Sequence, residues 1–217
     1  MSPEISVLLP SRDRPGPLVE SVASLRELAD DPARIEVLVA VDPDDPDTAQ
    51  AARDCEAEAW RAPERFGYAR LHEYVNALAH QAGGDWMLLW NDDARMRTRG
   101  WDSRILEAPP GVLWPNANGY TAENTFPIVH RAVVERIGHV SLSPHYDSWL
   151  HAVAEQAGIH HRIAVEVFHD RADFTGGHDD QTWRESRAHQ RTAEFHSPPM
   201  VAARRRDAHL LRSAPLV

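Results

Sequence analysis

Two adjacent acids and an amide, Asn91-Asp92-Asp93, follow a short run of bulky apolar residues, Trp86 to Trp90. An apolar run of this length between turn signals is typical of a fully buried strand in a parallel sheet. Carboxylates at the carboxyl end of such a strand lie at the rim where open α/β sheets bind ligands. Because adjacent carboxylates repel each other and hard divalent cations prefer oxygen ligands, we expect a cation there. The alternative is a solvated turn or a helix N-cap, since Asp favours both.

Other apolar runs precede polar loops in the same way. Ile35 to Val41 leads into the acidic loop Asp42 to Asp47, and Ile5 to Pro10 leads into the polar loop Ser11 to Pro15. The segments between the runs carry apolar residues at helical spacing. We expect helices over Leu18 to Leu28, over Thr48 to Ala59 with Asp47 as N-cap, and over Tyr68 to Ala82, with a short strand around Trp60.

Strand and helix thus alternate over residues 5–90. This order predicts an α/β fold, a single Rossmann-like domain with a mostly parallel central sheet flanked by helices. The acidic loops at Asp42 and Asn91 then share the carboxyl edge of that sheet.

The second half of the chain is less regular. Its pattern predicts strands at Val112 to Trp114, at Phe126 to His130 on a sheet edge and at Ile163 to Phe168, and helices at Gly100 to Glu107, Arg131 to Ile137 and Tyr146 to Ala157. We assign residues 1–170 to the α/β domain and residues 171–217 to a polar extension rich in His and Arg, which packs on the domain or trails from it. Within that extension, Arg204 to Leu211 form either a small amphipathic helix or a loose tail.

Composition excludes several classes of protein. The 217 residues carry a formal net charge of −10, which makes nucleic acid an unfavourable partner. A single cysteine, Cys55, excludes an internal disulfide and a cysteine zinc cluster, and its helical setting indicates a packing role. No apolar run reaches the ~18 residues that span a bilayer, and Ile5 to Pro10 is too short for a signal peptide. We therefore expect a cytoplasmic protein without a transmembrane segment.

The order of these motifs resembles that of family 2-type glycosyltransferases, which have the GT-A fold of the nucleotide-diphospho-sugar transferase superfamily. ISVLLPSRDRP is similar to the first strand and loop of the family, EVLVAVDPDDPDT to its second strand and acidic loop, and Asn91-Asp92-Asp93 to its DxD-type motif. Two further matches flank that motif: Asn76, Ala79, Ala82, Gly84 and Asp85 before it, and Gly100-Trp101-Asp102 after it. The resemblance covers about Ile5 to Asp170 and implies a nucleotide-sugar half over residues 1–95 and an acceptor half over residues 96–170.

The resemblance implies a nucleotide pocket lined by Pro10, Ser11 and Arg14. Asp42 would contact the base or the ribose of the nucleotide, with Asp44 as its rival. These roles make the first two strand ends the binding site for a UDP- or GDP-sugar donor.

The same resemblance implies a divalent cation, Mn²⁺ or Mg²⁺. Asp92 would face the ribose or the pyrophosphate, and Asp93 would ligate the metal. His169 follows the last predicted strand, where some relatives use a histidine as a further ligand; His178-Asp179-Asp180 is the next choice. Because the family more often has an acid at position 91, the neutral Asn91 implies a weaker metal dependence.

Asp147 is the candidate general base. It begins a helix in HYDSWL, where the family often shows an acidic pair, and Tyr146 replaces the other acid. A carboxylate there would take the proton of an acceptor hydroxyl during transfer. The alternative is that Asp147, Ser143 or Ser148 only caps the helix.

The tryptophans divide into two groups. We expect Trp86 and Trp90 in the core, whereas Trp114, Trp149 and Tyr120 are candidates for a sugar-stacking surface. Acceptor choice would then depend on the irregular loops Pro115 to Thr125 and Arg171 to Pro199.

The function implied is a metal-dependent glycosyltransferase acting on an unknown glycan, small-molecule or protein acceptor, with inversion if Asp147 is the base. One alternative is a sugar-phosphate nucleotidyltransferase, although SRDRPG has a single glycine where those enzymes carry a glycine-rich basic loop. Another is a non-catalytic nucleotide- or sugar-binding module, which Asn91 and the lone acid Asp147 favour.

Overall fold

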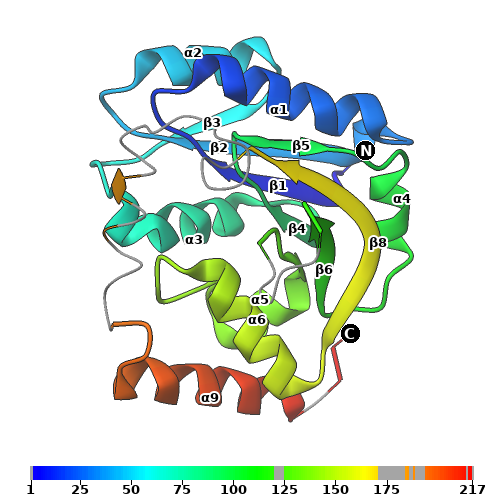
Figure 1. Cartoon of the computed structure of the whole chain (residues 1–217), viewed down its shortest axis with the longest axis vertical. Helices are drawn as coiled ribbons and strands as arrows, with labels where there is room; N and C mark the ends of the chain where they lie inside the picture. Colours follow the sequence, from blue (N-terminus) through cyan, green and yellow to red (C-terminus); the bar gives the residue numbers. More distant parts are fainter. Residues whose placement is uncertain are drawn as a thin grey trace.

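The computed structural model of the protein (Figure 1) describes residues 2–119, 125–170, 184–185, 188, 194–213 and 215–216. These residues contain one eight-stranded sheet with the strand order β3-β2-β1-β4-β7-β6-β8-β5. The strands are β1 (Ile5–Pro10), β2 (Ile35–Val41), β3 (Glu58–Arg61), β4 (Trp86–Leu89), β5 (Ala94–Met96), β6 (Val112–Ala117), β7 (Ile128–His130) and β8 (His160–His169). The helices are α1 (Pro15–Leu28), α2 (Pro46–Asp54), α3 (Leu71–Gln81), α4 (Trp101–Leu106), α5 (Arg131–Ile137), α6 (Tyr146–Ala157) and α9 (Pro198–Arg212), with 3-10 turns η1 (Pro32–Arg34) and η2 (Tyr68–Arg70).

The first half of the sheet is parallel, as the alternation of strands and helices predicts. β1 pairs in parallel with β2 on one side and with β4 on the other, and β2 pairs in parallel with β3. The carboxyl ends of all four strands therefore lie along one edge, and the two acidic loops meet there.

The second half of the sheet is mixed. β7 runs antiparallel to both of its neighbours, β4 and β6, while β8 pairs in parallel with β6 and antiparallel with β5. The prediction of an edge strand at Phe126 to His130 is wrong, because β7 lies inside the sheet. A short strand preceded by proline is typical of an edge, but Ile128 and Val129 are fully buried by strands on both sides.

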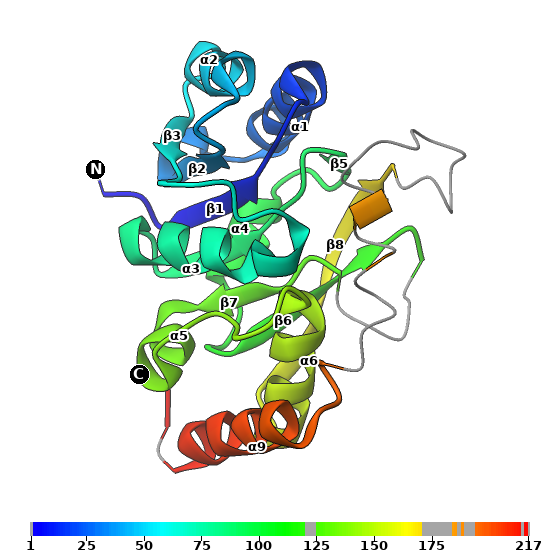
Figure 2. The ribbon, with the colours of Figure 1, turned by 90° about the vertical axis from the view of Figure 1, so that its left-hand side faces the viewer.

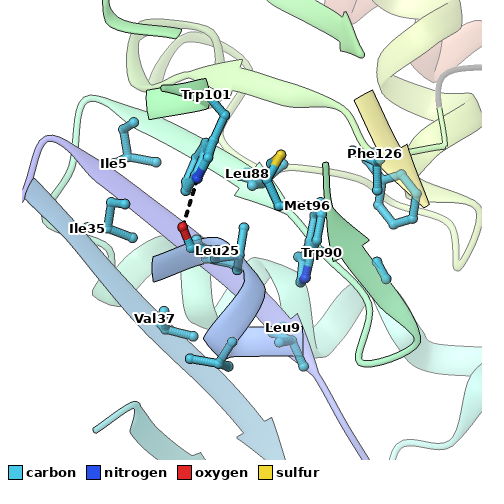
Figure 3. Packing of buried hydrophobic residues seen from close by; sticks show 14 of the residues in the cluster. Ile5, Leu9, Leu25, Ile35, Val37, Leu88, Trp90, Met96, Trp101 and Phe126 are labelled. Atoms are coloured by element: carbon cyan, nitrogen blue, oxygen red, sulfur yellow. Dashed lines mark hydrogen bonds between the residues drawn. The ribbon is translucent and has the colours of Figure 1, made fainter. Parts of the chain in front are cut away.

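Alternate residues of the central strands supply two hydrophobic cores, one on each face. Leu9 of β1 packs with α1, α2 and α4, whereas its neighbour Leu8 packs with α3, α5, α6 and α9. Figure 2 shows α1 and α2 on one side of the β1–β3 region and α3 on the other. Figure 3 shows the first core, where the indole Nε1 of Trp101 donates to the carbonyl of Leu25 at 2.9 Å. Burial on both faces explains why these strands are almost continuously apolar in the sequence.

Two element boundaries differ from the sequence prediction. α2 was expected to continue to Ala59, but it ends at Asp54, and β3 begins at Glu58. Glu56 between them has a left-handed φ of 57°, which does not continue the helix. The residue types in this segment do not indicate that change of backbone conformation. At the other end of α2, Asp45 rather than Asp47 is the N-cap, and its carboxylate accepts the backbone N–H of Thr48 at 3.1 Å.

The end of the chain is a helix rather than a loose tail. α9 packs along α5 and α6 on the α3 side of the sheet (Figure 2). Its buried Asp207 accepts a hydrogen bond from the Trp149 indole at 3.3 Å, and burial raises the pKa of the Asp207 carboxyl. Among the described residues, no helix is long and apolar enough to cross a membrane. The division of the chain at residues 95 and 170 stays a prediction.

A pair of histidines lies between α6 and the start of β8. The ring of His160 stacks on Trp114 with centroids 5.1 Å apart and meets the edge of His151 at 4.6 Å. Within the described ranges, Nε2 of His160 is buried without a hydrogen-bond partner. Burial, and then the neighbouring His151, lower the pKa of His160 to about 4.

We predict that His160 makes the protein less stable in mild acid. The unfolded chain protonates this histidine near its ordinary pKa of about 6.5, whereas the folded chain does so only near 4. Its contribution to stability is thus complete above about pH 6.5 and falls as the pH decreases towards 4. Thermal unfolding at about pH 7.5 and about pH 5 should show a smaller loss of Tm for His160→Gln than for the wild type. Equal losses would contradict this.

Candidate functional site

The candidate site lies where β1, β2 and β4 end and where the long strand β8 returns to the same edge. Its residues come from the loop after β1 (residues 11–14), the loop after β2 (residues 42–45), the turn after β4 (residues 91–93) and the end of β8. The turn after β4 is tied directly to β8, since the N–H of Asp170 donates to the carbonyl of Asp93 at 2.9 Å. The structure therefore brings together loops that are far apart in the sequence.

Asp92 is buried, with 6% of its surface exposed. One carboxylate oxygen accepts from the Ser11 hydroxyl at 2.7 Å, and the other accepts from the Arg14 guanidinium at 2.8 Å. Burial raises the pKa of Asp92; Arg14 and the hydrogen bond from Ser11 oppose that rise, whereas the charge of Asp93 adds to it. Asp92 thus joins the loop after β1 to the end of β4, and Arg14 is the N-cap residue of α1.

Asp93 and His169 form a close pair. The Nε2 atom of His169 lies 3.2 Å from Oδ1 of Asp93, and Arg14 lies 3.6 Å from the other oxygen. Burial alone would raise the pKa of Asp93, but His169 and Arg14 together outweigh it and hold this pKa below its ordinary value. Within the described part of the chain, Oδ1 of Asp93 is buried and accepts no hydrogen bond of acceptable geometry.

His169 is fixed from two sides. The Asn118 side chain accepts its backbone N–H at 3.1 Å and donates to its carbonyl at 2.7 Å, and Phe126 packs edge-on against its ring at 4.8 Å. Asn118 itself has a φ of 50°, a left-handed conformation that asparagine tolerates better than most residues. The imidazole is therefore held at the strand end with Nε2 towards Asp93.

Asn91 contacts several other residues at the end of β4. Its carbonyl accepts from the Ser21 hydroxyl at 3.1 Å, and its side-chain oxygen accepts from the Tyr146 hydroxyl at 3.1 Å. Its side-chain nitrogen lies 3.5 Å from Nε2 of His169. Burial, and then the charge of Asp147, raise the pKa of Tyr146 well above 10, so that its hydroxyl stays protonated and donates.

Asp42 is also enclosed by partners. Its side chain is only 3% exposed; Arg12 donates to one oxygen at 2.8 Å, and the Tyr74 hydroxyl donates to the other. Burial and then Asp42 raise the pKa of Tyr74 to about 12. Asp44, in contrast, is 61% exposed, and its hydrogen bonds with Arg12 lower its pKa. Of the two rivals, Asp42 is thus the buried carboxylate at the end of β2, while Asp44 lies on the surface beside it.

Asp147 lies in the first turn of α6, next to Tyr146. It is not the N-cap: that position is His145, which makes no side-chain cap. One oxygen of Asp147 accepts the N–H of Ser148 at 2.7 Å, and the side chain is partly exposed. Asp147 is therefore not the N-cap residue, although its carboxylate satisfies one N–H of the first turn of α6.

The aromatic predictions divide. Trp86 and Trp90 are core residues, as expected. Trp149 is fully buried, and Trp114 is packed between His160 and His151, so the prediction of a sugar-stacking surface is wrong for both. Tyr120, the other aromatic candidate, lies outside the described residues, as does His178-Asp179-Asp180.

Sequence reasoning missed Arg12 and Tyr74. Tyr74 lies on the apolar face of α3 beside Val75 and Leu78, where it looks like a core residue. A signal was nevertheless available, because a buried tyrosine hydroxyl needs a partner. Arg65 is a further neighbour, 3.9 Å from Asp42, and it pairs with Glu185 at 2.7 Å, which brings one described piece of the C-terminal extension close to the end of β2.

Comparisons with known proteins establish the fold. No family model and no curated protein sequence matches the chain. Solved structures do match: TarS of S. aureus in complex with UDP has a TM-score of 0.60 at 16% identity, over 90% of this chain and 72% of that one. Mannosyltransferase PcManGT of Pyrobaculum calidifontis, in complex with GDP-Man and Mn²⁺, has a TM-score of 0.62 at 16% identity, over 97% and 70%.

A third similar structure is glucosyl-3-phosphoglycerate synthase of Mycobacterium tuberculosis in complex with Mn²⁺, UDP and phosphoglyceric acid. Its TM-score is 0.61 at 13% identity, over 86% of this chain and 78% of that one. The chain therefore has the GT-A-type glycosyltransferase fold, and the fold class predicted from the sequence is confirmed.

We predict that Ser11 stabilises the fold through Asp92. Ser11→Ala removes one of the two side-chain donors to a buried carboxylate, which should lower the free energy of unfolding by about 1.5–3 kcal/mol. Ser103→Ala is the matched control, because Ser103 donates to Asp30 at 2.7 Å on the exposed surface. Its effect should stay within about 0.5 kcal/mol in the same urea titration. Similar losses for both variants would show that the Asp92 contact contributes nothing special.

Proposed function

We propose that the protein is a metal-dependent glycosyltransferase that moves a sugar from a nucleotide-diphosphate sugar to a hydroxyl acceptor. One observation carries this proposal: Asp93 in the turn after β4 and His169 at the end of β8 lie 3.2 Å apart at the carboxyl edge of a GT-A-type sheet. The proteins that share this fold include complexes with UDP, with GDP-Man and with Mn²⁺.

The residues present fit a hard divalent cation. Two ligands about 2.1 Å from one Mn²⁺ or Mg²⁺, at a right angle, are about 3 Å apart, which agrees with the 3.2 Å between Oδ1 and Nε2. The buried Oδ1 of Asp93 has Nε2 of His169 3.2 Å away and no hydrogen bond among the described residues, so a cation shared with His169 would give it a ligand contact. No group of three or more acidic, His or Cys side chains in the described ranges suits a metal. Asp93 and His169 would therefore share the ion with phosphate oxygens and water, as Mg²⁺ and Mn²⁺ sites often do.

The nucleotide would occupy the ends of β1 and β2. Pro10 and Ser11 would line the nucleotide there, and Asp42, held by Arg12 and Tyr74, would contact the base or ribose. A carboxylate oxygen has two lone pairs, so Asp42 can still accept from a ligand while it holds its protein partners. Asp92 and Arg14 lie between this pocket and Asp93, where the ribose and the pyrophosphate would follow.

The transfer step needs a base and a stabilised leaving group. The acceptor oxygen would form a bond to the anomeric carbon while the bond from that carbon to the diphosphate breaks, and the electron pair leaves with the diphosphate. The bound cation would supply charge neutralisation for that leaving group. Asp147 would take the proton of the acceptor hydroxyl, and attack from the face opposite the leaving group would invert the anomeric centre.

Arg14 favours one alternative. Its guanidinium lies 2.8 Å from Asp92 and 3.6 Å from Asp93, so part of the acidic charge is neutralised by the protein itself. A non-catalytic nucleotide-binding module needs no further neutralisation of these two carboxylates by a metal ion. Such a module would bind UDP or GDP in a calorimeter and yet turn over no donor.

We predict that Asp93 is required for Mn²⁺-dependent turnover. Hydrolysis of UDP- and GDP-sugars should increase with Mn²⁺ in the wild type and fall at least about 100-fold in Asp93→Ala, because loss of a ligand costs at least as much as loss of its supporting contacts. Asp54→Ala, an exposed acid at the end of α2, is the control and should behave as the wild type. Equal background turnover in all samples would exclude the enzyme.

We also predict that Asp147 acts on the rate of transfer rather than on donor binding. Asp147→Asn keeps the size of the side chain but removes the base, so kcat should fall by about 10²–10⁴-fold. The KM for the donor should change little, since Asp147 lies on α6 and not in the loops after β1 and β2. A raised donor KM with an unchanged kcat would reject Asp147 as the base.

A further inference from the structure

The hydrogen bond between Asn91 and Tyr146 joins two parts of the candidate site that are 55 residues apart. Tyr146 belongs to α6, and its hydroxyl donates to Oδ1 of Asn91 at the end of β4 at 3.1 Å. The phenol ring is buried in the core that α6 forms with the sheet. The hydroxyl therefore reaches the strand end from inside the protein.

Asn91 is itself held in place. Its backbone carbonyl accepts from Ser21 at 3.1 Å and from the N–H of Ala94 at 3.1 Å, which closes the turn containing Asp92 and Asp93. The hydroxyl of Ser21 also accepts from the indole of Trp90 at 2.8 Å. Through Asn91, Tyr146 is thus connected to a strand end that is itself held by hydrogen bonds.

The hydrogen bond from Tyr146 to Asn91 connects sequence neighbours of the proposed base and of the proposed metal ligand. Tyr146 is the first residue of α6 and directly precedes Asp147, the proposed base, while Asn91 is two residues from Asp93, the proposed ligand. His145 at the N-cap position makes no side-chain cap, and within the first turn the Asp147 carboxylate accepts the N–H of Ser148 at 2.7 Å. The Tyr146 hydroxyl ties this turn to the end of β4.

From these contacts we propose that Tyr146 and Asn91 are a positioning pair, which sets the place of Asp147 relative to Asp93 and His169. The inference rests on the proposed function. The pair contributes a neutral donor and a neutral acceptor, so it fixes this distance without adding charge beside Asp92 and Asp93. Neither residue touches the reacting atoms; both act through their neighbours.

A kinetic double-mutant cycle tests the pair. Tyr146→Phe keeps the buried ring and removes only the hydroxyl, and it should lower kcat about tenfold, because small displacements of a catalytic group are costly. The donor KM and the Kd for Mn²⁺ should stay within about twofold of the wild type. Asn91→Ala should lower kcat at least as much, because it also removes the contact with His169, and the double variant should be no slower than Asn91→Ala alone, since the Tyr146–Asn91 contact is already lost there.

The control removes another buried hydroxyl close to α6. Ser141, in the loop before this helix, donates to the carbonyl of Ser143 at 2.7 Å and is fully buried. Ser141→Ala should reduce stability by an amount similar to Tyr146→Phe while it leaves kcat within about twofold of the wild type. An unchanged kcat in folded Tyr146→Phe, or effects that multiply in the double variant, would overturn the proposal.

A second measurement does not depend on turnover. Hydrogen exchange of the amides in the first turn of α6 should slow about threefold or more when Mn²⁺ and UDP, or Mn²⁺ and GDP, are added to the wild type. Tyr146→Phe should lose this response. Equal slowing in both proteins, or none in the wild type, would overturn the inference. A wild type that turns over no donor would fail the proposed function, and the exchange measurement would then decide the inference alone.

Discussion

The burial of the Asp92 carboxylate is the constraint on which the rest of the site depends. A charge taken out of water must be compensated within the fold, and Ser11 and Arg14 provide that compensation from the loop after β1. As a result, the ends of β1 and β4 cannot move independently. Arg14 is also the N-cap residue of α1, so this helix, which covers one face of the sheet, starts directly after the same contact. Asp93 directly follows Asp92, so its backbone is held in place by the contacts of Asp92.

The parts of the fold that burial determines were predictable from the sequence. β1, β2 and β4 lie between two cores, so their residues are apolar without interruption, and the loops that follow them are polar. This is why Asp42, Asp92 and Asp93 could be assigned to one edge. β7 was predicted at an edge because a three-residue strand carries little sequence information about its neighbours. Its pairing with β4 and β6 is decided by the topology of the whole sheet.

Contacts across long sequence separations were the other limit. The family pattern showed that Asn91 and Tyr146 each replace an acid, but it treated them as separate departures. In the structure they are hydrogen-bonded to each other. Tyr74 and Asp42 are a similar case, since nothing in the local pattern of α3 indicates which acid its tyrosine meets. The sequence identifies such residues singly, whereas their partners come from the fold.

The two anchors of His169 have a consequence for how such a protein could diversify. Asn118 holds its backbone and Phe126 packs on its ring, and the chain between these two residues contains most of the predicted acceptor loop. Both ends of that segment are thus attached to a proposed metal ligand. Diversification would therefore be constrained at Asn118 and Phe126, because a change at either position would disturb the placement of His169.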